Sequence, residues 1–185
     1  MDTLFNNLSW MVWNVVLAVL PVVFIILFTK SKINLEKIIF FVFWFLFLPN
    51  SIYLITDIQY LPGQINGEFY RDLLLIFEYL ILVSLGIVTY FYALDPFIKF
   101  LKKRYKKHNL NYFIFVFNFL ISFGVVLGKI QRAESWDVFI HPLQILSNVN
   151  ALIIKQNELV FVIFFGIIIN VIYFVRTSII DQFVS

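Results

Sequence analysis

Residues 8–28 read LSWMVWNVVLAVLPVVFIILF, a nearly continuous apolar run that contains Asn14 and Pro21. The hydrocarbon core of a bilayer is about 30 Å thick, and a helix needs roughly 17–25 mostly apolar residues to cross it. Comparable runs follow at residues 38–55, 73–91, 110–127 and 159–175. Because lipid offers no partners to backbone amides, runs of this kind form helices. The sequence therefore predicts an all-α polytopic membrane helix bundle with five transmembrane helices, organised as a single membrane domain over residues 1–185.

The composition excludes several classes of protein. Of the 185 residues, 62% are apolar, 20% aromatic and only 14% charged, which is too apolar for an ordinary soluble domain or a disordered chain. The absence of cysteine excludes disulfides, thiolate zinc sites and iron–sulfur clusters. No phosphate-binding or metal-binding motif occurs either. We therefore expect no metal, no cofactor and, since most of the surface faces lipid, no nucleic-acid partner.

The distribution of Lys and Arg predicts the orientation. Two alternate loops contain nine basic residues: Lys30, Lys32, Lys37, Lys99, Lys102, Lys103, Arg104, Lys106 and Lys107. The loops on the other side contain four: Arg71, Lys129, Arg132 and Lys155. Cytoplasmic loops are enriched in Lys and Arg. The pattern predicts an N-terminus outside and a C-terminus inside a multi-pass protein.

The stretch 136–154 is apolar enough to resemble a sixth span, but its pattern is amphipathic. One helical face would hold Phe139, Leu143, Leu146 and Ile153, and the opposite face His141, Gln144, Asn148 and Lys155. Such a pattern is typical of a helix that lies in the membrane interface. We predict an interfacial or re-entrant helix over about 139–154. A crossing would instead place the C-terminus outside.

The second span is interrupted by Pro49 and Asn50 at a depth inside the membrane. Proline removes one backbone donor and frees a carbonyl group of the preceding turn. Two interpretations stay open: a kink whose polar neighbours repair the backbone, or a helix break that serves a ligand. Tyr53 and Asp57 are four residues apart and share a helical face if the segment stays helical.

The third span brings two acidic residues to the membrane. Asp72 precedes it, and the first interpretation is a helix cap, since carboxylates stabilise helix N-termini. Glu78 lies about 8 Å further in by helical rise. An ionisable residue at that depth is functional, neutral or paired, and Arg71 is on the same face.

Under the predicted orientation, four charged residues from different loops meet the outer membrane surface: Asp57, Asp72, Arg132 and Asp137. An arginine can bridge two carboxylates through paired hydrogen bonds. The group would suit a hydrated cation, a sugar or a lipid headgroup. It would equally suit a structural network that holds the loops together.

Three strings then occur in a fixed order. They are Trp13-Asn14-Val15 through Pro21, Leu48-Pro49-Asn50 through Thr56-Asp57, and Leu127-Gly128-Lys129 through Ser135-Trp136-Asp137-Val138. Together they resemble the bacterial membrane-protein family called domain of unknown function 1361, over about residues 10–175. The family's patterns mark Asn14, Pro49, Asn50, Tyr53, Thr56, Asp57, Asp72, Arg132, Trp136 and Asp137.

The chain departs from the family pattern at three positions. Ile52 stands where the family tends to have proline, Tyr60 where a histidine often follows Thr-Asp, and Lys129 where arginine is usual. The missing histidine weakens a metal or acid–base role for this patch. The resemblance implies a bacterial cell membrane location and no particular activity.

Three functions follow from these observations. The first is a small membrane protein that binds a lipid headgroup or a protein partner through an outer-face polar cluster; membrane lipids, another membrane protein or a second copy of the chain would be its partners. The second is a membrane-embedded enzyme acting on a lipid or lipid-linked substrate, with Asp57 or Asp137 as acid–base group and Arg132 binding phosphate. The third is a transporter component. The predicted cluster comprises Asn50, Tyr53, Thr56, Asp57, Asp72, Arg132, Trp136 and Asp137, with Glu78 as a separate intramembrane ionisable residue.

Overall fold

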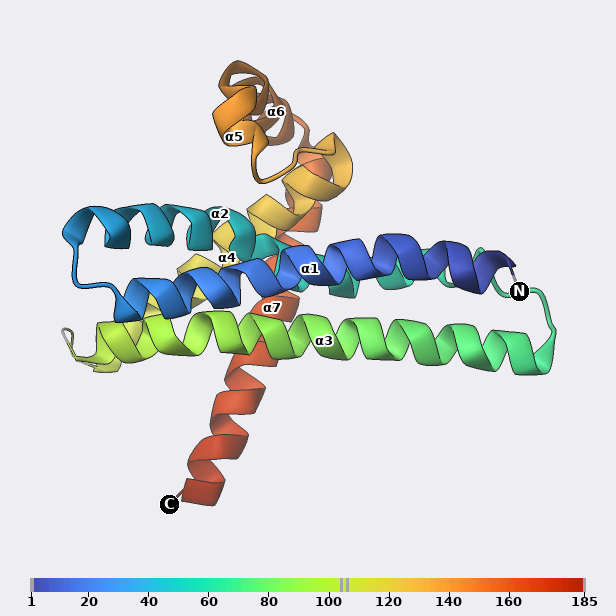
Figure 1. Cartoon of the computed structure of the whole chain (residues 1–185), viewed down its shortest axis with the longest axis horizontal. Helices are drawn as coiled ribbons and strands as arrows, with labels where there is room; N and C mark the ends of the chain where they lie inside the picture. The colour runs from blue at the N-terminus through green and yellow to red at the C-terminus, as the bar shows by residue number, and fades with distance from the viewer. Residues whose placement is uncertain (1, 104, 106, 185) are drawn as a thin grey trace. The chain divides into compact units, whose positions relative to one another are not determined.

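The computed structural model describes residues 2–103, 105 and 107–184, and the regular structure in these ranges is helical. The elements are α1 (Asp2–Lys30), α2 (Asn34–Thr56), the 3₁₀-helix η1 (Asp57–Tyr60), α3 (Phe69–Lys102), α4 (Lys107–Gln131), α5 (Asp137–Ile140), α6 (Pro142–Ile154) and α7 (Gln156–Val184). Figure 1 shows their order along the chain.

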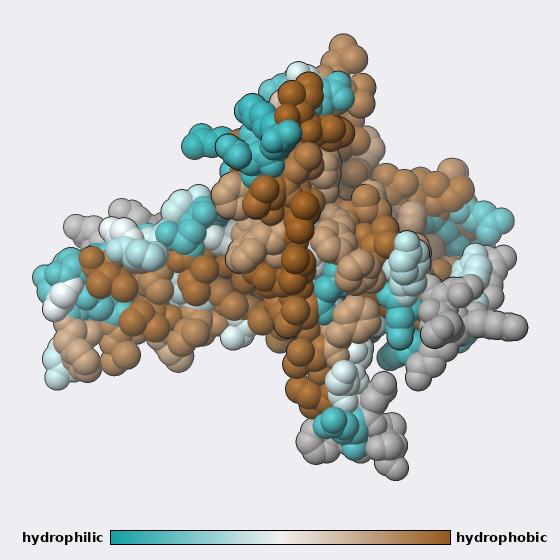
Figure 2. All heavy atoms as spheres, turned by 180° about the vertical axis from the view of Figure 1, so that it is seen from behind, coloured by the Kyte–Doolittle hydropathy of each residue, from teal (hydrophilic) through white to brown (hydrophobic). Residues whose placement is uncertain are grey.

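Five of the helices are long and apolar enough to cross a membrane, as the sequence predicts. Their apolar segments are Asn7–Lys30, Asn34–Tyr60, Phe69–Lys102, Leu110–Gln131 and Gln156–Ile179. Each is longer than the run expected from composition, because the helices continue into their polar flanks. Figure 2 shows hydrophobic atoms over the middle parts of the helices and hydrophilic atoms gathered toward their ends. The chain is a multi-pass helical membrane protein.

The helices form two compact units, Met1–Lys103 and Arg104–Ser185. In the first unit, consecutive helices among α1, α2 and α3 run in opposite directions, and each helix contacts the other two (Figure 1). In the second unit α7 contacts both α4 and α6. A single membrane domain over residues 1–185 stays a prediction.

Small residues set the closest approach in the first unit. The hydroxyl of Ser51 on α2 donates a hydrogen bond of 3.1 Å to the carbonyl oxygen of Ala18 on α1, and both residues are fully buried. On α3, a Cβ added to Gly86 would lie 2.8 Å from the carbonyl oxygen of Ser51. Small residues at helix crossings let backbones approach closely in membranes. This contact fixes the register of α1, α2 and α3.

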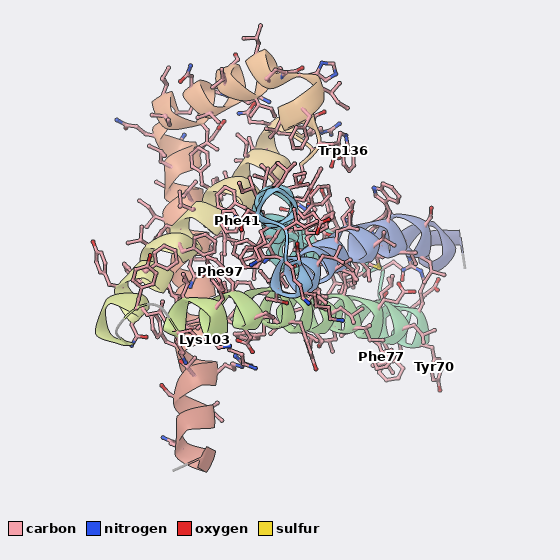
Figure 3. All side chains as sticks on the ribbon, turned by 60° about the vertical axis from the view of Figure 1, so that its left-hand side comes forward. Phe41, Tyr70, Phe77, Phe97, Lys103 and Trp136 are labelled. Carbon is pink, nitrogen blue, oxygen red and sulfur yellow. The ribbon has the colours of Figure 1, made fainter. Side chains whose placement is uncertain are left out.

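One half of the first unit is filled by aromatic side chains. Trp44 is fully buried, donates a hydrogen bond of 2.9 Å to the carbonyl oxygen of Ala93, and has its ring centroid 4.4 Å from that of Phe97. We call this region the aromatic half; its members are Phe24, Phe28, Phe41, Phe43, Trp44, Phe47, Phe97 and Phe100. Figure 3 shows Phe41 and Phe97 near one another in this half, between α2 and α3.

Helix α2 is continuous through Pro49. A proline inside a helix removes one hydrogen bond, but the flanking turns persist here from Asn34 to Thr56. The structure therefore contains no broken helix at Pro49–Asn50. The geometry does not support a discontinuous helix that serves a ligand. Pro49 lies inside an intact helix.

The second unit is held by polar contacts between α4 and α7. Asn118 donates a hydrogen bond of 3.0 Å to the side chain of Asn170, and Ser122 donates one of 2.7 Å to the carbonyl oxygen of Val162. Gly166 lies beneath the ring of Phe119, so close that an added Cβ would overlap it. The asparagines of the apolar runs therefore serve helix–helix packing in this unit.

The stretch predicted as one amphipathic helix over about 139–154 is two helices, α5 and α6, that meet at His141. Proline disfavours the helical conformation of the residue before it, and Pro142 occupies the first turn of α6. At 13 residues, α6 is about 20 Å long, too short to span the hydrocarbon core. Leu143 and Leu146 are exposed on it, which fits a helix at the membrane interface.

Candidate functional site

A buried carboxylate marks the site. Asp57 begins η1, where α2 ends, and is only 1% exposed. The side-chain amide of Asn14 on α1 donates a hydrogen bond of 3.1 Å to its Oδ2 atom. A buried charge is costly unless it is hydrogen-bonded or paired. Asp57 and Asn14, both marked by the family resemblance, therefore form a hydrogen-bonded pair that links α1 to the end of α2.

A second layer of polar side chains lies next to this pair. Asn7 and Gln64 exchange two hydrogen bonds of 2.6 and 3.1 Å, from Asn7 Nδ2 to Gln64 Oε1 and from Gln64 Nε2 to Asn7 Oδ1. The indole nitrogen of Trp10 donates a hydrogen bond of 3.3 Å to Oδ1 of Asn7. Asn7 is buried. This layer ties the start of α1 to the loop after η1.

Helix α3 brings Glu78 and Tyr79 to the same place. Glu78 lies beside the side chain of Asn7, and the hydroxyl of Tyr79 lies near Asp57 and Gln64. Tyr79 is fully buried, yet within the described residues neither its hydroxyl nor Oε2 of Glu78 has a hydrogen-bond partner. A buried unsatisfied polar group costs about 1–3 kcal/mol. These two atoms are therefore buried polar atoms that the described part of the chain leaves unsatisfied.

We call this group the polar site; it comprises Asn7, Asn14, Asp57, Gln64, Glu78 and Tyr79. Its deep end adjoins the small-residue contact of Ser51 with Ala18, beyond which lies the aromatic half. Its other end adjoins the loop between η1 and α3. The site is thus polar at the loop end of the first unit and closed by packed side chains at the other.

The loop between η1 and α3, residues 61–68, which we call the mouth of the polar site, is organised by Asp72. Its carboxylate accepts hydrogen bonds from the backbone amides of Asn66, at 3.3 Å, and Gly67, at 2.8 Å, and pairs with Arg71 at 3.4 Å. Gly67 has a φ of 92°, a conformation that other residues adopt at a cost. Asp72 therefore holds the preceding loop, rather than capping the first-turn amides of α3. Arg71 also donates a hydrogen bond of 2.9 Å to the carbonyl oxygen of Gln64.

Aromatic side chains are exposed along the first turns of α3, which follow this loop. Tyr70 is 81% exposed and Phe77 60% exposed, and Phe69 is exposed beside them. Figure 3 shows Tyr70 and Phe77 directed away from the three-helix unit, at the end of α3 opposite to Phe97. Exposed aromatic residues of this kind are enriched where a membrane protein meets lipid headgroups.

The remaining predicted residues of α2 are placed differently. The hydroxyl of Thr56 donates a hydrogen bond of 2.6 Å to the carbonyl oxygen of Tyr53, within its own helix. Asn50 and Tyr53 are half-buried, and both have partners. Thr56 therefore completes the last turn of α2, next to Asp57.

Arg132, Trp136 and Asp137 belong to the second unit. Arg132 follows the end of α4 with a φ of 52° and an exposed side chain, and Asp137 accepts a hydrogen bond of 2.8 Å from the backbone amide of Glu134. Desolvation by partial burial raises the pKa of Glu134 above its ordinary value, and the nearby carboxylate of Asp137 raises it further. The grouping of Arg132 with the aspartates of the first unit stays a prediction.

The polar site has the chemistry of a hydrogen-bonding site. Its side chains supply carboxylate, amide and phenol groups, with the indole of Trp10 at its edge. In the part of the chain that the structure describes, no group of three or more His, Cys, Asp or Glu residues is arranged to hold a metal ion. These carboxylate, amide and phenol groups can bind a ligand through hydrogen bonds and charge.

The comparison with known families adds one match. The family model described as "Protein of unknown function (DUF1361)" matches residues 13–172. The chain belongs to this family. The match covers helices of both units and includes Asn14, Asp57, Gln64, Glu78 and Tyr79 of the polar site, whereas Asn7 precedes it. No curated protein and no solved structure matches the chain.

Sequence reasoning missed three members of the polar site in this DUF1361 protein: Asn7, Gln64 and Tyr79. A signal for the first was available, since Asn7 and Asn14 are seven residues apart and so share one helical face. Gln64 lies in a loop, and Tyr79 resembles the aromatic residues around it. Both depend on the register of the three helices, which no local pattern encodes.

Proposed function

We propose that the protein binds the polar headgroup of a membrane lipid in the polar site. The observation that carries this proposal is the pair of unpartnered atoms, the Tyr79 hydroxyl and Oε2 of Glu78, beside the buried Asp57. Native proteins satisfy nearly all buried polar atoms, and exceptions call for a functional explanation. A ligand group that hydrogen-bonds to both atoms supplies that explanation.

The surroundings of the mouth favour a lipid over a soluble ligand. Tyr70 and Phe77 are exposed on the first turns of α3, which follow the loop at the mouth, and they point away from the three-helix unit. These side chains anchor a helix at the level of the headgroups, and Arg71 at the same level can contact a phosphate. A headgroup that enters the mouth leaves its acyl chains in the bilayer, along the apolar surface of α3.

Transport through the first unit is disfavoured by the aromatic half. A conducting path requires polar groups or water across the whole membrane. Beyond Ser51 the interior holds stacked aromatic rings, and the buried Thr89 donates its hydroxyl to carbonyl oxygens of its own helix. Among the described residues, the buried unpartnered side-chain atoms lie in the polar site alone. The site is closed at depth, which suits binding.

One observation favours an enzyme as the second candidate. The hydroxyl of Tyr79 lies within electrostatic reach of the carboxylate of Asp57, and a phenol and a carboxylate that face one substrate can move a proton to or from it. An enzyme acting on a lipid or lipid-linked substrate would use the same headgroup site. Conversion of a bound lipid during incubation, followed by mass spectrometry, separates catalysis from binding.

The charge distribution predicts that the mouth of the polar site faces outward. A reporter that is active only in the cytoplasm should work when fused after Lys103 or at the C-terminus. It should fail after Gly63, in the loop at the mouth, and after Asp137. Activity at Gly63 would reverse the orientation, and failure at the C-terminus would mean that the chain crosses once more within 136–154.

Lipid binding itself is tested on the purified protein in detergent. We expect headgroup-bearing lipids to remain bound during purification, in native mass spectra, and to raise the unfolding temperature when added back, because a ligand that binds the folded state stabilises it. Tyr79→Phe should weaken both effects by removing one ligand-bonding atom. Tyr92→Phe is the matched control, since Tyr92 is exposed on α3 outside the site. If no added lipid bound to the native chain or raised its unfolding temperature, the proposal would be refuted.

A further inference from the structure

We propose that the polar site takes a primary ammonium group, carried by the headgroup of a lipid. This inference rests on the proposed function, which it makes chemically specific. Its starting point is the pair of unpartnered atoms, Oε2 of Glu78 and the buried hydroxyl of Tyr79, with the carboxylate of Asp57 near that hydroxyl.

The hydrogen-bonding capacity of the site favours a ligand that donates. Oε2 of Glu78 has no partner and is able to accept hydrogen bonds, and the hydroxyl of Tyr79 can accept as well as donate. The amides of Asn7 and Gln64 are already bonded to each other, and that of Asn14 to Asp57. A primary ammonium has three donors and no acceptor, which matches the acceptors that Glu78 and Tyr79 present.

The charge of the site favours a cation. Two acidic residues lie within it, and among the described residues no Lys, Arg or His forms an ion pair with Glu78. Arg71 stands at the mouth, where it contacts Asp72 and the carbonyl oxygen of Gln64. A neutral sugar could bond to the same atoms but would leave the carboxylate of Glu78 without a counterion. An ammonium satisfies both requirements.

The aromatic rings at the site suit the same ligand. The ring of Trp10 is 6.0 Å from that of Tyr60, in an edge-on arrangement, and 6.3 Å from that of Tyr79. Cations are attracted to the faces of aromatic rings, and tryptophan is the strongest of these partners. A quaternary ammonium would also contact the rings, but it has no N–H donor for Glu78 or Tyr79. The site therefore discriminates primary from quaternary amines.

The experiment compares lipids with matched acyl chains and different headgroups. The unfolding temperature of the purified full chain is measured in detergent with added phosphatidylethanolamine, its mono-, di- and trimethylated forms, or phosphatidylglycerol. We expect stabilisation to fall as methyl groups replace N–H donors, and to be smallest for phosphatidylglycerol. Free ethanolamine forms a separate arm: stabilisation by it alone, without lipid, would assign the site to a soluble amine and overturn the lipid source.

Glu78→Gln is the decisive variant, since it keeps the shape of the side chain and removes its charge. We expect it to weaken phosphatidylethanolamine binding about 10- to 100-fold, the range for losing a hydrogen bond to a charged group. Its affinity for phosphatidylglycerol should be unchanged or higher. Glu68→Gln is the control, because Glu68 is exposed at the start of α3. The methylation series on the native chain tests the proposal even if Glu78→Gln does not fold.

The outcomes separate this inference from the proposed function. Equal stabilisation by all headgroups would overturn the ammonium assignment and leave headgroup binding intact. No stabilisation by any lipid would overturn both. Stabilisation by Na⁺ alone that equals that of the amine lipid would assign the site to an inorganic cation and overturn the inference.

Discussion

Gly86→Ala is expected to destabilise the three-helix unit by about 1–3 kcal/mol, the usual cost of overpacking. The added Cβ would lie 2.8 Å from the carbonyl oxygen of Ser51 and 3.0 Å from Cβ of Leu54. One of these atoms is backbone, so α2 and α3 must separate. This separation outweighs the gain of about 1 kcal/mol that alanine brings to a helix.

The measurement is the free energy of unfolding in detergent, with Gly63→Ala as the matched control. At Gly63 the nearest atom to an added Cβ is 3.8 Å away, an ordinary contact, and that variant should be close to neutral. Because the Gly86 contact also sets the register of the helices, Gly86→Ala should weaken lipid binding as well. If both variants were equally stable, the close approach of α2 and α3 would be wrong.

Trp44→Ala is expected to have a still larger effect, about 3–5 kcal/mol, the range for removing a large buried aromatic side chain. Trp44 is fully buried and packs against Phe41 and Phe97. Its indole also donates the hydrogen bond to the carbonyl oxygen of Ala93 that joins α2 to α3. The variant leaves a cavity and removes this hydrogen bond between α2 and α3.

Unfolding monitored by circular dichroism measures this loss, and two further variants interpret it. Trp13→Ala is the control, since Trp13 is 55% exposed on α1. Trp44→Phe keeps a ring but no donor, and should lose less stability than Trp44→Ala. A loss no greater than that of Trp13→Ala would contradict the buried position of Trp44.

The spans could be predicted from the sequence because length and apolarity alone decide which segments cross a bilayer. The helix ends could not, since α3 continues past its apolar run to Lys102 and α2 continues through Pro49. In both, backbone hydrogen bonds persist where hydropathy or proline indicates an interruption. The break at His141 is a local effect of Pro142, yet the amphipathic pattern runs across it.

The candidate site was only partly predictable. Asp57 and Glu78 stood out because a charge in an apolar environment is conspicuous in sequence. Tyr79 did not, because its burial beside Asp57 depends on how α3 is aligned with α2, and that alignment is set by Gly86 against Ser51. Asp72 was expected to cap a helix, but its carboxylate instead accepts hydrogen bonds from the loop amides of Asn66 and Gly67.

Under the proposed function, the packed rings around Trp44 imply that the two leaflets of the bilayer are not equivalent for this protein. On that proposal, a molecule bound beside Asp57 would exchange through the loop end, because the opposite end of the first unit holds the packed rings of Phe41, Trp44 and Phe97. The occupancy of the polar site should therefore depend on the lipid composition of the leaflet at the mouth and not on that of the other leaflet. In asymmetric vesicles, enriching the leaflet at the mouth with an amine lipid should stabilise the protein, and enriching the opposite leaflet should leave its stability unchanged.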